Sequence, residues 1–238
     1  PRLTTDITIS VDSVDKMVAD ALDAVERGFT ALKVKVGKDI DTDLARVRAV
    51  HAAVRGRATL RLDANQGWTA DEAVRALAAL ETAGVELDLV EQPVAASDID
   101  GLEYVTRHVT TPVLADESVF DLAQAAEVIR RRAADIVNIK LMKTGGITGA
   151  LAIADLCAAH GVECMMGCML ETSISVAAAA HVAVARSSVI TRVDLDGPQL
   201  GRFDPVEGGA TFAGPDIVLS ESPGLGIGAV RGLEPPPA

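Results

Sequence analysis

The sequence predicts an α/β fold, a TIM-type (β/α) barrel in which parallel strands alternate with helices. Short apolar segments with the character of strands recur eight times, and amphipathic segments with the character of helices lie between them. The interval between strands is roughly 23–28 residues, the repeat expected of βα units. At 238 residues the chain has a length at which such barrels commonly form one undivided domain. A doubly wound open sheet is the competing architecture, but its Gly-rich first turn, G-x-G-x-x-G, does not follow the first strand.

The individual elements can be placed from apolar runs and from the residues that punctuate them. The strands are predicted at residues 7–11, 31–36, 59–63, 87–91, 113–115, 136–140, 163–167 and 190–195. Thr69 and Glu72 form a capping box ahead of a helix over residues 73–83, and Gly84 lies where a glycine commonly ends a helix. The other predicted boundaries are Ser13 or Asp12 and Gly28 for the first helix, Asp121 for a helix over 122–132, and His160-Gly161 for a helix over 147–159.

The chain is predicted to contain one barrel and a tail. Residues 1–200 form the catalytic (β/α) barrel, and no linker or low-complexity segment interrupts them. Residues 201–238 are rich in Gly and Pro, so we predict a loop-like C-terminal tail with a mobile Pro-Pro-Pro-Ala end.

Composition excludes several classes of function. The formal net charge of −12 argues against nucleic acid and anionic membranes as partners, because both require clustered Lys and Arg. An anionic small molecule stays possible, because a metal ion and lysines can reverse the sign locally. The three cysteines have no C-x-x-C spacing and no disulfide-like framework, and no segment resembles a signal peptide. A reducing, cytoplasmic location is the simplest expectation.

Two lysines stand out on the second predicted strand. Lys33 and Lys35 are two residues apart, so their side chains project to the same face of the strand, which we expect to be the inside. A buried lysine is costly unless charges or chemistry compensate it. The barrel should therefore supply acids nearby.

Acids are found where such barrels place their active sites, at the C-terminal ends of the strands. Asp63, Glu91 and Asp116 come from three adjacent strands and offer only oxygen ligands, the set that suits Mg²⁺. Lys35 and Lys140, from strands two and six, would stand on opposite sides of that metal ion. This layout suits the movement of a proton between the two faces of one carbon.

Several motifs together resemble those of the enolase superfamily, in its modified (β/α)7β barrel. They are most similar to the muconate lactonizing enzyme subgroup, and within it to dipeptide epimerases of the L-Ala-D/L-Glu epimerase type. The resemblance runs from about Thr5 to Gly228. The motifs are Lys33-Val34-Lys35, Leu62-Asp63-Ala64-Asn65-Gln66-Gly67-Trp68, Val90-Glu91-Gln92-Pro93, Ala115-Asp116-Glu117-Ser118, Asn138-Ile139-Lys140-Leu141-Met142-Lys143 and Asp194-Leu195-Asp196.

The resemblance implies a reaction and a role for each residue. One Mg²⁺ per site, held by Asp63, Glu91 and Asp116, would bind the α-carboxylate of a dipeptide's C-terminal residue and stabilise an enediolate. Lys35 and Lys140 would be the two acid/base catalysts, with Lys33 lowering the pKa of Lys35. Asp194 and Asp196 would receive the dipeptide's α-ammonium. Cys168 and Met169 should line the pocket, Asn65 and Glu117 should lie just behind the metal ligands, and Lys143 should be peripheral.

The chain departs from the family in one respect, and two other functions stay open. The family normally has an N-terminal α+β capping domain, whereas this sequence starts almost directly on the first barrel strand, so we expect it to be part of a longer protein. One alternative is a cycloisomerase or dehydratase of the same subgroup, of the muconate cycloisomerase or o-succinylbenzoate synthase type. The other is a non-catalytic metal-binding barrel. We expect a dipeptide substrate and a homo-oligomeric assembly.

Overall fold

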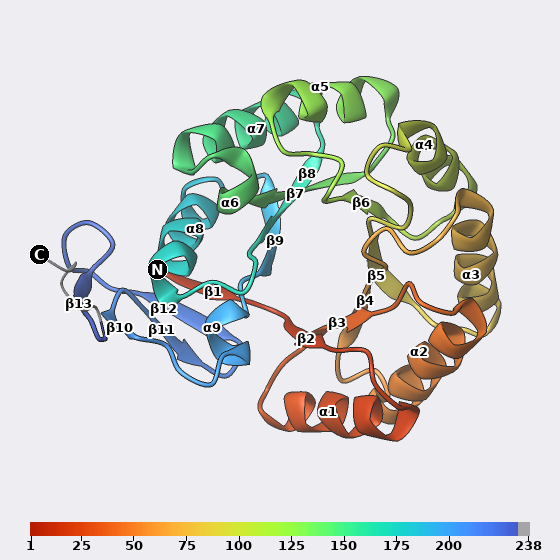
Figure 1. Cartoon of the computed structure of the whole chain (residues 1–238), viewed down its shortest axis with the longest axis horizontal. Coiled ribbons are helices and arrows are strands. Elements are labelled where there is room, and N and C mark those ends of the chain that lie inside the picture. The colour runs from red at the N-terminus through yellow and green to blue at the C-terminus, as the bar shows by residue number, and fades with distance from the viewer. Residues whose placement is uncertain (233–238) are drawn as a thin grey trace, which may run out of the picture.

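A ring of eight parallel strands forms the centre of the molecule (Figure 1). A computed structural model describes residues 1–232, in which each barrel strand pairs in parallel with the next one along the chain. The prediction of a (β/α) barrel is confirmed. The barrel strands are β2 (Ile7–Ile9), β3 (Ala31–Lys35), β4 (Thr59–Asp63), β5 (Leu87–Glu91), β6 (Val113–Ala115), β7 (Ile136–Lys140), β8 (Glu163–Gly167) and β9 (Ile190–Asp194).

Helices surround the strands on the outside (Figure 1). Seven of them, within the described residues, connect one barrel strand to the next: α1 (Val14–Glu26), α2 (Ile40–Val54), α3 (Ala70–Thr82), α4 (Ile99–His108), α5 (Leu122–Arg131), α7 (Ile147–His160) and α8 (Ser173–Ala185). Two single-turn helices, α6 (Leu141–Thr144) and α9 (Gly197–Leu200), follow β7 and β9. The resulting order is the (β/α)7β arrangement implied by the resemblance.

The predicted helix signals act as expected. Ser13 caps α1, Asp121 caps α5, and Thr69 and Glu72 form the capping box of α3. The helix predicted at 73–83 starts earlier, at Ala70, because residues directly after an N-cap already adopt helical geometry. The strands predicted at 7–11, 31–36 and 190–195 are shorter at their ends, where the chain turns toward the next element.

Side chains of β3 show how the barrel separates two kinds of interior. Leu32 and Val34 are fully buried and belong to the large apolar core between strands and helices. Lys33 and Lys35 alternate with them and so face the inside of the ring. A second, smaller apolar cluster fills part of that inside and consists of Leu89, Leu114, Ile136 and Met165. The layer toward the C-terminal ends of the strands is left to charged side chains.

The first and last barrel strands, β2 and β9, meet at a seam. The pairing of strands runs from β2 to β9, and no ladder joins these two strands within the part of the chain that the structure describes. Backbone and side-chain bonds close the seam instead: Asp6 N to Val193 O at 3.3 Å, Leu195 N to Thr5 Oγ1 at 2.8 Å, and Thr8 N to Asp196 Oδ2 at 2.7 Å. One carboxylate, that of Asp196, is therefore part of the barrel's closure.

The tail, predicted to be loop-like, carries short strands between its loops. Residues after 200 carry four short strands, β10 (Val206–Gly208), β11 (Ala210–Ala213), β12 (Asp216–Leu219) and β13 (Ile227–Val230). β12 pairs with β11 on one side and on the other with β1 (Arg2–Thr4), a strand that was not predicted. These strands lie beside the barrel, next to the N-terminus (Figure 1). The Pro-Pro-Pro-Ala end lies outside the described residues.

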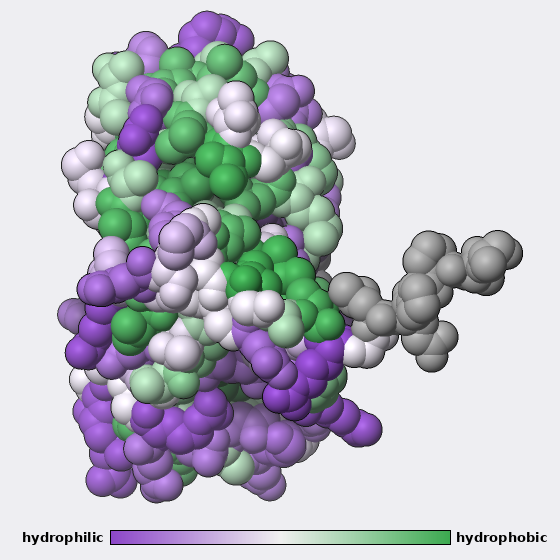
Figure 2. All heavy atoms as spheres, turned by 90° about the vertical axis from the view of Figure 1, so that its left-hand side faces the viewer, coloured by the Kyte–Doolittle hydropathy of each residue, from purple (hydrophilic) through white to green (hydrophobic). Residues whose placement is uncertain are grey.

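The surface is divided unevenly between apolar and polar residues. On the side that carries α8 and β10–β13, apolar residues gather in the upper half and hydrophilic ones dominate the lower half (Figure 2). An apolar cavity of about 640 Å³ lies between α6, α7 and α8, bordered by Met142, Ile147, Leu170 and Ile174. Of the helices that the structure describes, none has the length and apolar character needed to cross a membrane.

Candidate active site

A cavity of about 340 Å³ opens at the C-terminal ends of the barrel strands. The predicted site residues that line it are Lys33, Lys35, Asn65, Asp116, Glu117, Lys140, Cys168, Met169 and Asp196. Asp63, Glu91 and Asp194 are fully buried at the ends of β4, β5 and β9. The structure thus brings together residues that the sequence spreads over more than 160 positions.

The predicted metal ligands lie on adjacent strands, and each contacts a nitrogen-bearing side chain. Asp63 Oδ2 lies 2.5 Å from Lys35 Nζ, and Asp116 Oδ2 lies 2.6 Å from Lys140 Nζ. Glu91 Oε1 accepts a hydrogen bond from Asn138 Nδ2 at 2.8 Å. Each catalytic lysine that the sequence predicts is therefore held against a predicted metal ligand.

The pKa values of two of these acids move in opposite directions. Burial and the neighbouring Asp63 raise the pKa of Glu91 well above its usual range. Burial also works to raise the pKa of Asp116, but Lys143 and Lys140 outweigh it and lower that pKa. Of the three predicted metal ligands, Glu91 has the least compensation for its negative charge. Its Oε2 is buried without a hydrogen-bond partner.

The donor set fits a hard divalent cation. Asp63, Glu91 and Asp116 offer only oxygens, as Mg²⁺ prefers, and the unpartnered oxygen of Glu91 is one that a cation would satisfy. The distances between carboxylate oxygens favour a different set of acids as metal ligands, however. Among the described residues, Asp6, Asp194 and Asp196 bring one oxygen each to within 4.8 Å of one another. The role of Asp63, Glu91 and Asp116 as metal ligands stays a prediction.

Lys140 is held in its charged form. Burial works to lower the pKa of Lys140, but Asp116 and Glu91 outweigh it and raise that pKa. Lys35 is less buried and contacts Asn65 Oδ1 at 2.8 Å in addition to Asp63. The two ammonium groups come from β3 and β7, separate strands of the ring, and both line the cavity.

Lys33 does not share its surroundings with Lys35. Its ammonium forms an ion pair with Asp194 Oδ2, and both side chains are almost completely buried. Burial works to lower the pKa of Lys33, but Asp194 and Glu91 outweigh it and raise that pKa well above its usual range. Asp194 is therefore already paired with a cation on β3.

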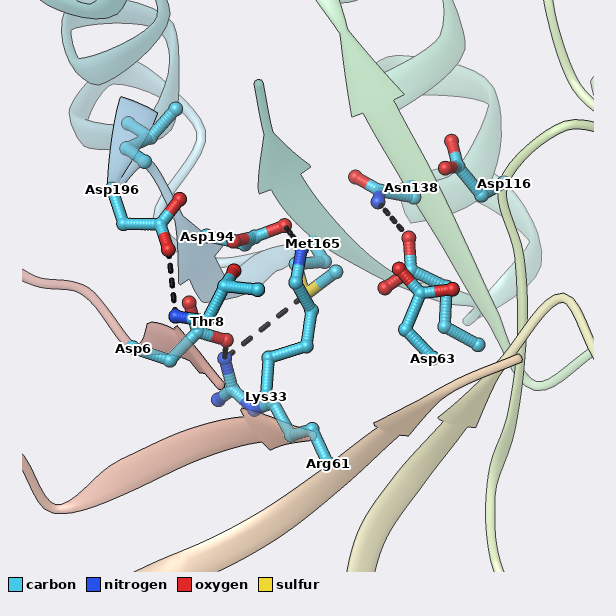
Figure 3. A network of polar contacts seen from close by, with 12 residues as sticks. Asp6, Thr8, Lys33, Arg61, Asp63, Asp116, Asn138, Met165, Asp194 and Asp196 are labelled. Carbon is cyan, nitrogen blue, oxygen red and sulfur yellow. Dashed lines mark hydrogen bonds and ion pairs between the residues drawn. The ribbon is translucent and has the colours of Figure 1, made fainter. Parts of the chain in front are cut away.

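Asp6, Asp194 and Asp196 form a second acidic group, called here the seam cluster because it lies where β2 meets β9. Figure 3 shows this cluster on one side of the site and Asp63 and Asp116 on the other. The sequence predicts that Asp194 and Asp196 act together, and the structure adds Asp6, which was not predicted. Asp6 was missed because a single acid just before the first strand is usually a solvated surface residue.

The expectation that Lys143 is peripheral is wrong. Its side chain is 1% exposed. Its ammonium lies 2.5 Å from Asp116 Oδ1 and donates to the carbonyl oxygens of Asp116, Val119 and Asn138 at 2.6, 3.0 and 3.0 Å. The short helix α6 turns the chain back directly after β7, which points Lys143 inward. Without that helix in the prediction, the inward position could not be inferred.

The residues predicted behind the metal ligands contact each other. Asn65 Nδ2 donates to Glu117 Oε1 at 3.2 Å, so Asn65 links Lys35 to Glu117. Sequence reasoning missed Thr8, Ser10, Leu170 and Leu200 of the cavity wall, and also Asn138, which holds Glu91. Asn138 could have been found, because it is two residues before Lys140 on the same strand and so shares its face.

The chain matches the family model described as enolase C-terminal domain-like over residues 16–231. The chain belongs to this family. The match spans all eight barrel strands but β2, so the motifs that carried the resemblance lie within it.

Close relatives of the chain are dipeptide epimerases. It is 51% identical over 230 residues to the L-Ala-D/L-Glu epimerase of Clostridium acetobutylicum, covering 97% of this chain and 64% of that protein. It is 47% identical over 228 residues to the hydrophobic dipeptide epimerase of Enterococcus faecalis, covering 95% of this chain and 64% of that protein. The chain thus spans less than two thirds of the length of these relatives.

Solved structures agree with the sequence relatives. A substrate-liganded complex of the L-Ala-D/L-Glu epimerase from Bacillus subtilis is similar with a TM-score of 0.93 and 49% identity, covering 95% of this chain and 63% of that one. The Enterococcus faecalis dipeptide epimerase complexed with Mg and L-Leu-L-Tyr has a TM-score of 0.92 and 46% identity, covering 96% and 64%. The family-level fold of the barrel is therefore established.

Proposed function

We propose that this barrel, residues 1–200, carries the catalytic site of a Mg²⁺-dependent dipeptide epimerase. The reaction would be a 1,1-proton transfer at the α-carbon of the C-terminal residue of L-Ala-L-Glu or a related dipeptide. The observation that carries the proposal is the pair of lysines from β3 and β7 that line one cavity beside three carboxylates. The relatives named as dipeptide epimerases support it.

The two lysines suit a proton transfer that inverts a centre. Lys35 and Lys140 each end a different strand, so a carbon held between them presents one face to each side-chain nitrogen. One lysine, as the neutral amine, would take the α-proton and become the ammonium, and the other, as the ammonium, would give its proton to the opposite face. Asn65 holds Lys35 on one side, and Gly167 leaves room for the stem of Lys140 on the other.

Asp63, Glu91 and Asp116 would hold Mg²⁺, and the ion would stabilise the negative charge that develops on the substrate carboxylate. The contacts of these acids support this assignment. A proton-transfer site needs its lysines free of their ion pairs, and a cation on Asp63 and Asp116 would compete with Lys35 and Lys140 for those carboxylates. Lys143 would stay on the other oxygen of Asp116.

The seam cluster would select an amine. Asp196 lines the cavity and its Oδ2 accepts from Thr8 N, while Asp194 lies beneath it. A substrate α-ammonium could be bound there by charge-assisted hydrogen bonds. The cycloisomerase or dehydratase alternative uses substrates without an amine, which would give these acids no substrate cation to bind.

The test is solvent exchange at the α-carbon in D₂O with Mg²⁺ present. We expect deuterium to enter the C-terminal residue of L-Ala-L-Glu, and both epimers to form. Lys35→Ala and Lys140→Ala should each abolish epimerisation, because each removes the acid/base group on one face. Lys38→Ala is the matched control, since Lys38 is exposed and loses the same charge. Normal epimerisation by either site variant would refute the proposal. Mg²⁺ binding without exchange across a dipeptide panel would support the non-catalytic alternative.

A further inference from the structure

The seam cluster contains two buried acceptor oxygens without a donor, on carboxylates that each bring one oxygen to within 4.8 Å of the other. Asp6 Oδ1 and Asp194 Oδ1 are both buried and neither has a hydrogen-bond partner. Each residue's other oxygen is occupied: Asp6 Oδ2 accepts from Arg61 Nη1 at 2.8 Å, and Asp194 Oδ2 is paired with Lys33. Two ionised carboxylates buried this close together repel each other, and a proton on one of them removes the repulsion.

The charges around the cluster show which acid is the natural holder of that proton. Asp194 is paired with Lys33 from β3, and Asp196 accepts from the backbone N–H of Thr8. Asp6 depends on Arg61 from β4, and Arg61 is shared with Asp88 at 2.8 Å. Of the two acids with an unpartnered oxygen, Asp6 therefore has the weaker compensation for its charge.

The pKa directions agree with this assignment. Burial and the neighbouring Asp194 raise the pKa of Asp6 well above its usual range, against the opposing effect of Arg61 and Lys33. Burial works to raise the pKa of Asp194 as well, but Lys33 and Lys140 outweigh it and lower that pKa. Of the two acids, Asp6 is thus the one that holds the proton, and Asp194 is the one that stays ionised.

We infer that Asp6 is a positioning residue: it carries a proton and donates it in a hydrogen bond to Asp194 Oδ1. This inference rests on the proposed function, because Asp194 would supply negative charge beneath Asp196, where the substrate α-ammonium would bind. The proton removes the repulsion between the two acids and fixes the orientation of Asp194, which stays ionised. Asp6 itself lies beneath the cavity wall and touches no substrate.

Infrared spectroscopy tests the proton directly and needs no substrate. Neutral carboxyl groups have a C=O stretch that is separate from the carboxylate bands. We expect the intact protein at neutral pH, with Mg²⁺, to show a neutral-carboxyl band that Asp6→Asn removes. Asp88→Asn is the matched control, because it also removes an Arg61 partner but lies outside the cluster, so the band should persist. A band that survives in Asp6→Asn would place the proton elsewhere and overturn the inference.

Kinetics test the positioning role. Asn at position 6 keeps a donor for Asp194 and an acceptor for Arg61, whereas Leu keeps neither. We expect Asp6→Leu to raise the KM for L-Ala-L-Glu by about tenfold or more, as for loss of a hydrogen bond to a charged group. Asp6→Asn should keep KM within about threefold of the wild type, with kcat changing less than KM in both variants.

The two variants make the outcomes distinct. If Asp6 acted as an anion, Asp6→Asn would raise KM as much as Asp6→Leu, and the inference would fail. Should Asp6→Leu not fold, the comparison of Asp6→Asn with the wild type still decides between proton and charge. If the wild type showed no exchange with any dipeptide, the proposed function would fail, while the infrared result would still decide the state of Asp6.

Discussion

Gly167 occupies a position in the site that leaves no room for a side chain. It ends β8, and a Cβ built on it would lie 2.6 Å from Asn138 Oδ1 and 3.0 Å from Lys140 Cε. Both neighbours belong to the site, since Asn138 holds Glu91 and Lys140 is a proposed acid/base group. Lys140 can therefore occupy its place only because residue 167 has no side chain.

We predict that Gly167→Ala lowers kcat for α-deuterium exchange by about 100-fold, because a shift of about 1 Å in a reacting group can have that effect. Gly228→Ala is the matched control, since its added Cβ would be 3.6 Å from the nearest atom. Both variants should show similar thermal melting. If Gly167→Ala exchanged α-deuterium at the wild-type rate, the added methyl group would not displace Lys140, and the prediction would be wrong.

Lys143 is the second residue whose position makes a prediction. Its buried ammonium pairs with the Asp116 carboxylate and donates to three backbone carbonyls. Removing it leaves one oxygen of Asp116 buried without a positive charge beside it. We predict that Lys143→Met lowers the free energy of unfolding by about 3–5 kcal/mol, the range for breaking a buried pair. Urea denaturation measures it.

Lys16→Met is the control, because Lys16 pairs with Asp20 on the exposed face of α1 and should change stability by less than about 0.5 kcal/mol. Equal losses in the two variants would contradict the buried role of Lys143.

At the scale of elements, Asp88 joins its own strand, β5, to the neighbouring β4 and to β9, which lies farther around the ring. From β5 it accepts hydrogen bonds from Arg61 Nε on β4 at 2.8 Å and from Arg192 Nε on β9 at 3.0 Å. Burial works to raise the pKa of Asp88, but hydrogen bonding to Arg192 and the charge of Arg61 outweigh it and lower that pKa. Its carboxylate therefore stabilises the folded state more than the unfolded one.

The sign of the pH dependence follows. Because the folded pKa lies below the unfolded value of about 3.9, the stabilisation is complete above that value and disappears as pH falls through the folded pKa. We predict that Asp88→Asn loses about 2 kcal/mol at pH 7 and that the difference from wild type shrinks in acid. Urea denaturation from neutral to acidic pH measures it. Asp155→Asn, in an exposed pair with Arg186, should lose less at neutral pH. A loss in Asp88→Asn that is the same at all pH values would contradict this account.

Which elements could be predicted depended on how local their signals are. The barrel strands and the capped helices each have a signal within a few residues, such as the Thr69 to Glu72 box. The strands of the tail do not, since β12 pairs with β1 at the opposite end of the chain. Four-residue strands around Gly214 and Pro215 carry too little alternation to be separated from loops.

The same distinction applies to the site. Alternation along β3 placed Lys33 and Lys35 on one face, and the structure puts both inside the ring. Their partners differ, however: Lys35 meets Asp63 on the next strand, whereas Lys33 meets Asp194 on the last one. The second contact exists only because the barrel closes, which local sequence does not encode.

At the scale of the whole molecule, the barrel brings two acidic groups to one cavity and keeps them apart. Asp63, Glu91 and Asp116 lie on β4, β5 and just after β6, and the seam cluster lies where the ring closes. The positive charges of Lys33 and Lys140 act on both acidic groups, because each lysine interacts with Glu91 and with Asp194. One end of a substrate could therefore meet a metal while the other meets an acid.

The location of the metal can be decided by stability. A ligand that binds only the folded state stabilises it by mass action, by about 2.7 kcal/mol at a concentration 100 times its dissociation constant. We predict that Mg²⁺ raises the melting temperature of the EDTA-treated protein, that Glu91→Gln abolishes the rise, and that Asp196→Asn keeps it. Both substitutions remove one buried carboxylate charge, so they are matched. The opposite pattern would place Mg²⁺ in the seam cluster, whose acids lie closer together. We expect the first pattern, because Lys33 already pairs with Asp194 and the proton inferred on Asp6 satisfies the free oxygens of the seam cluster, whereas Glu91 Oε2 has no partner.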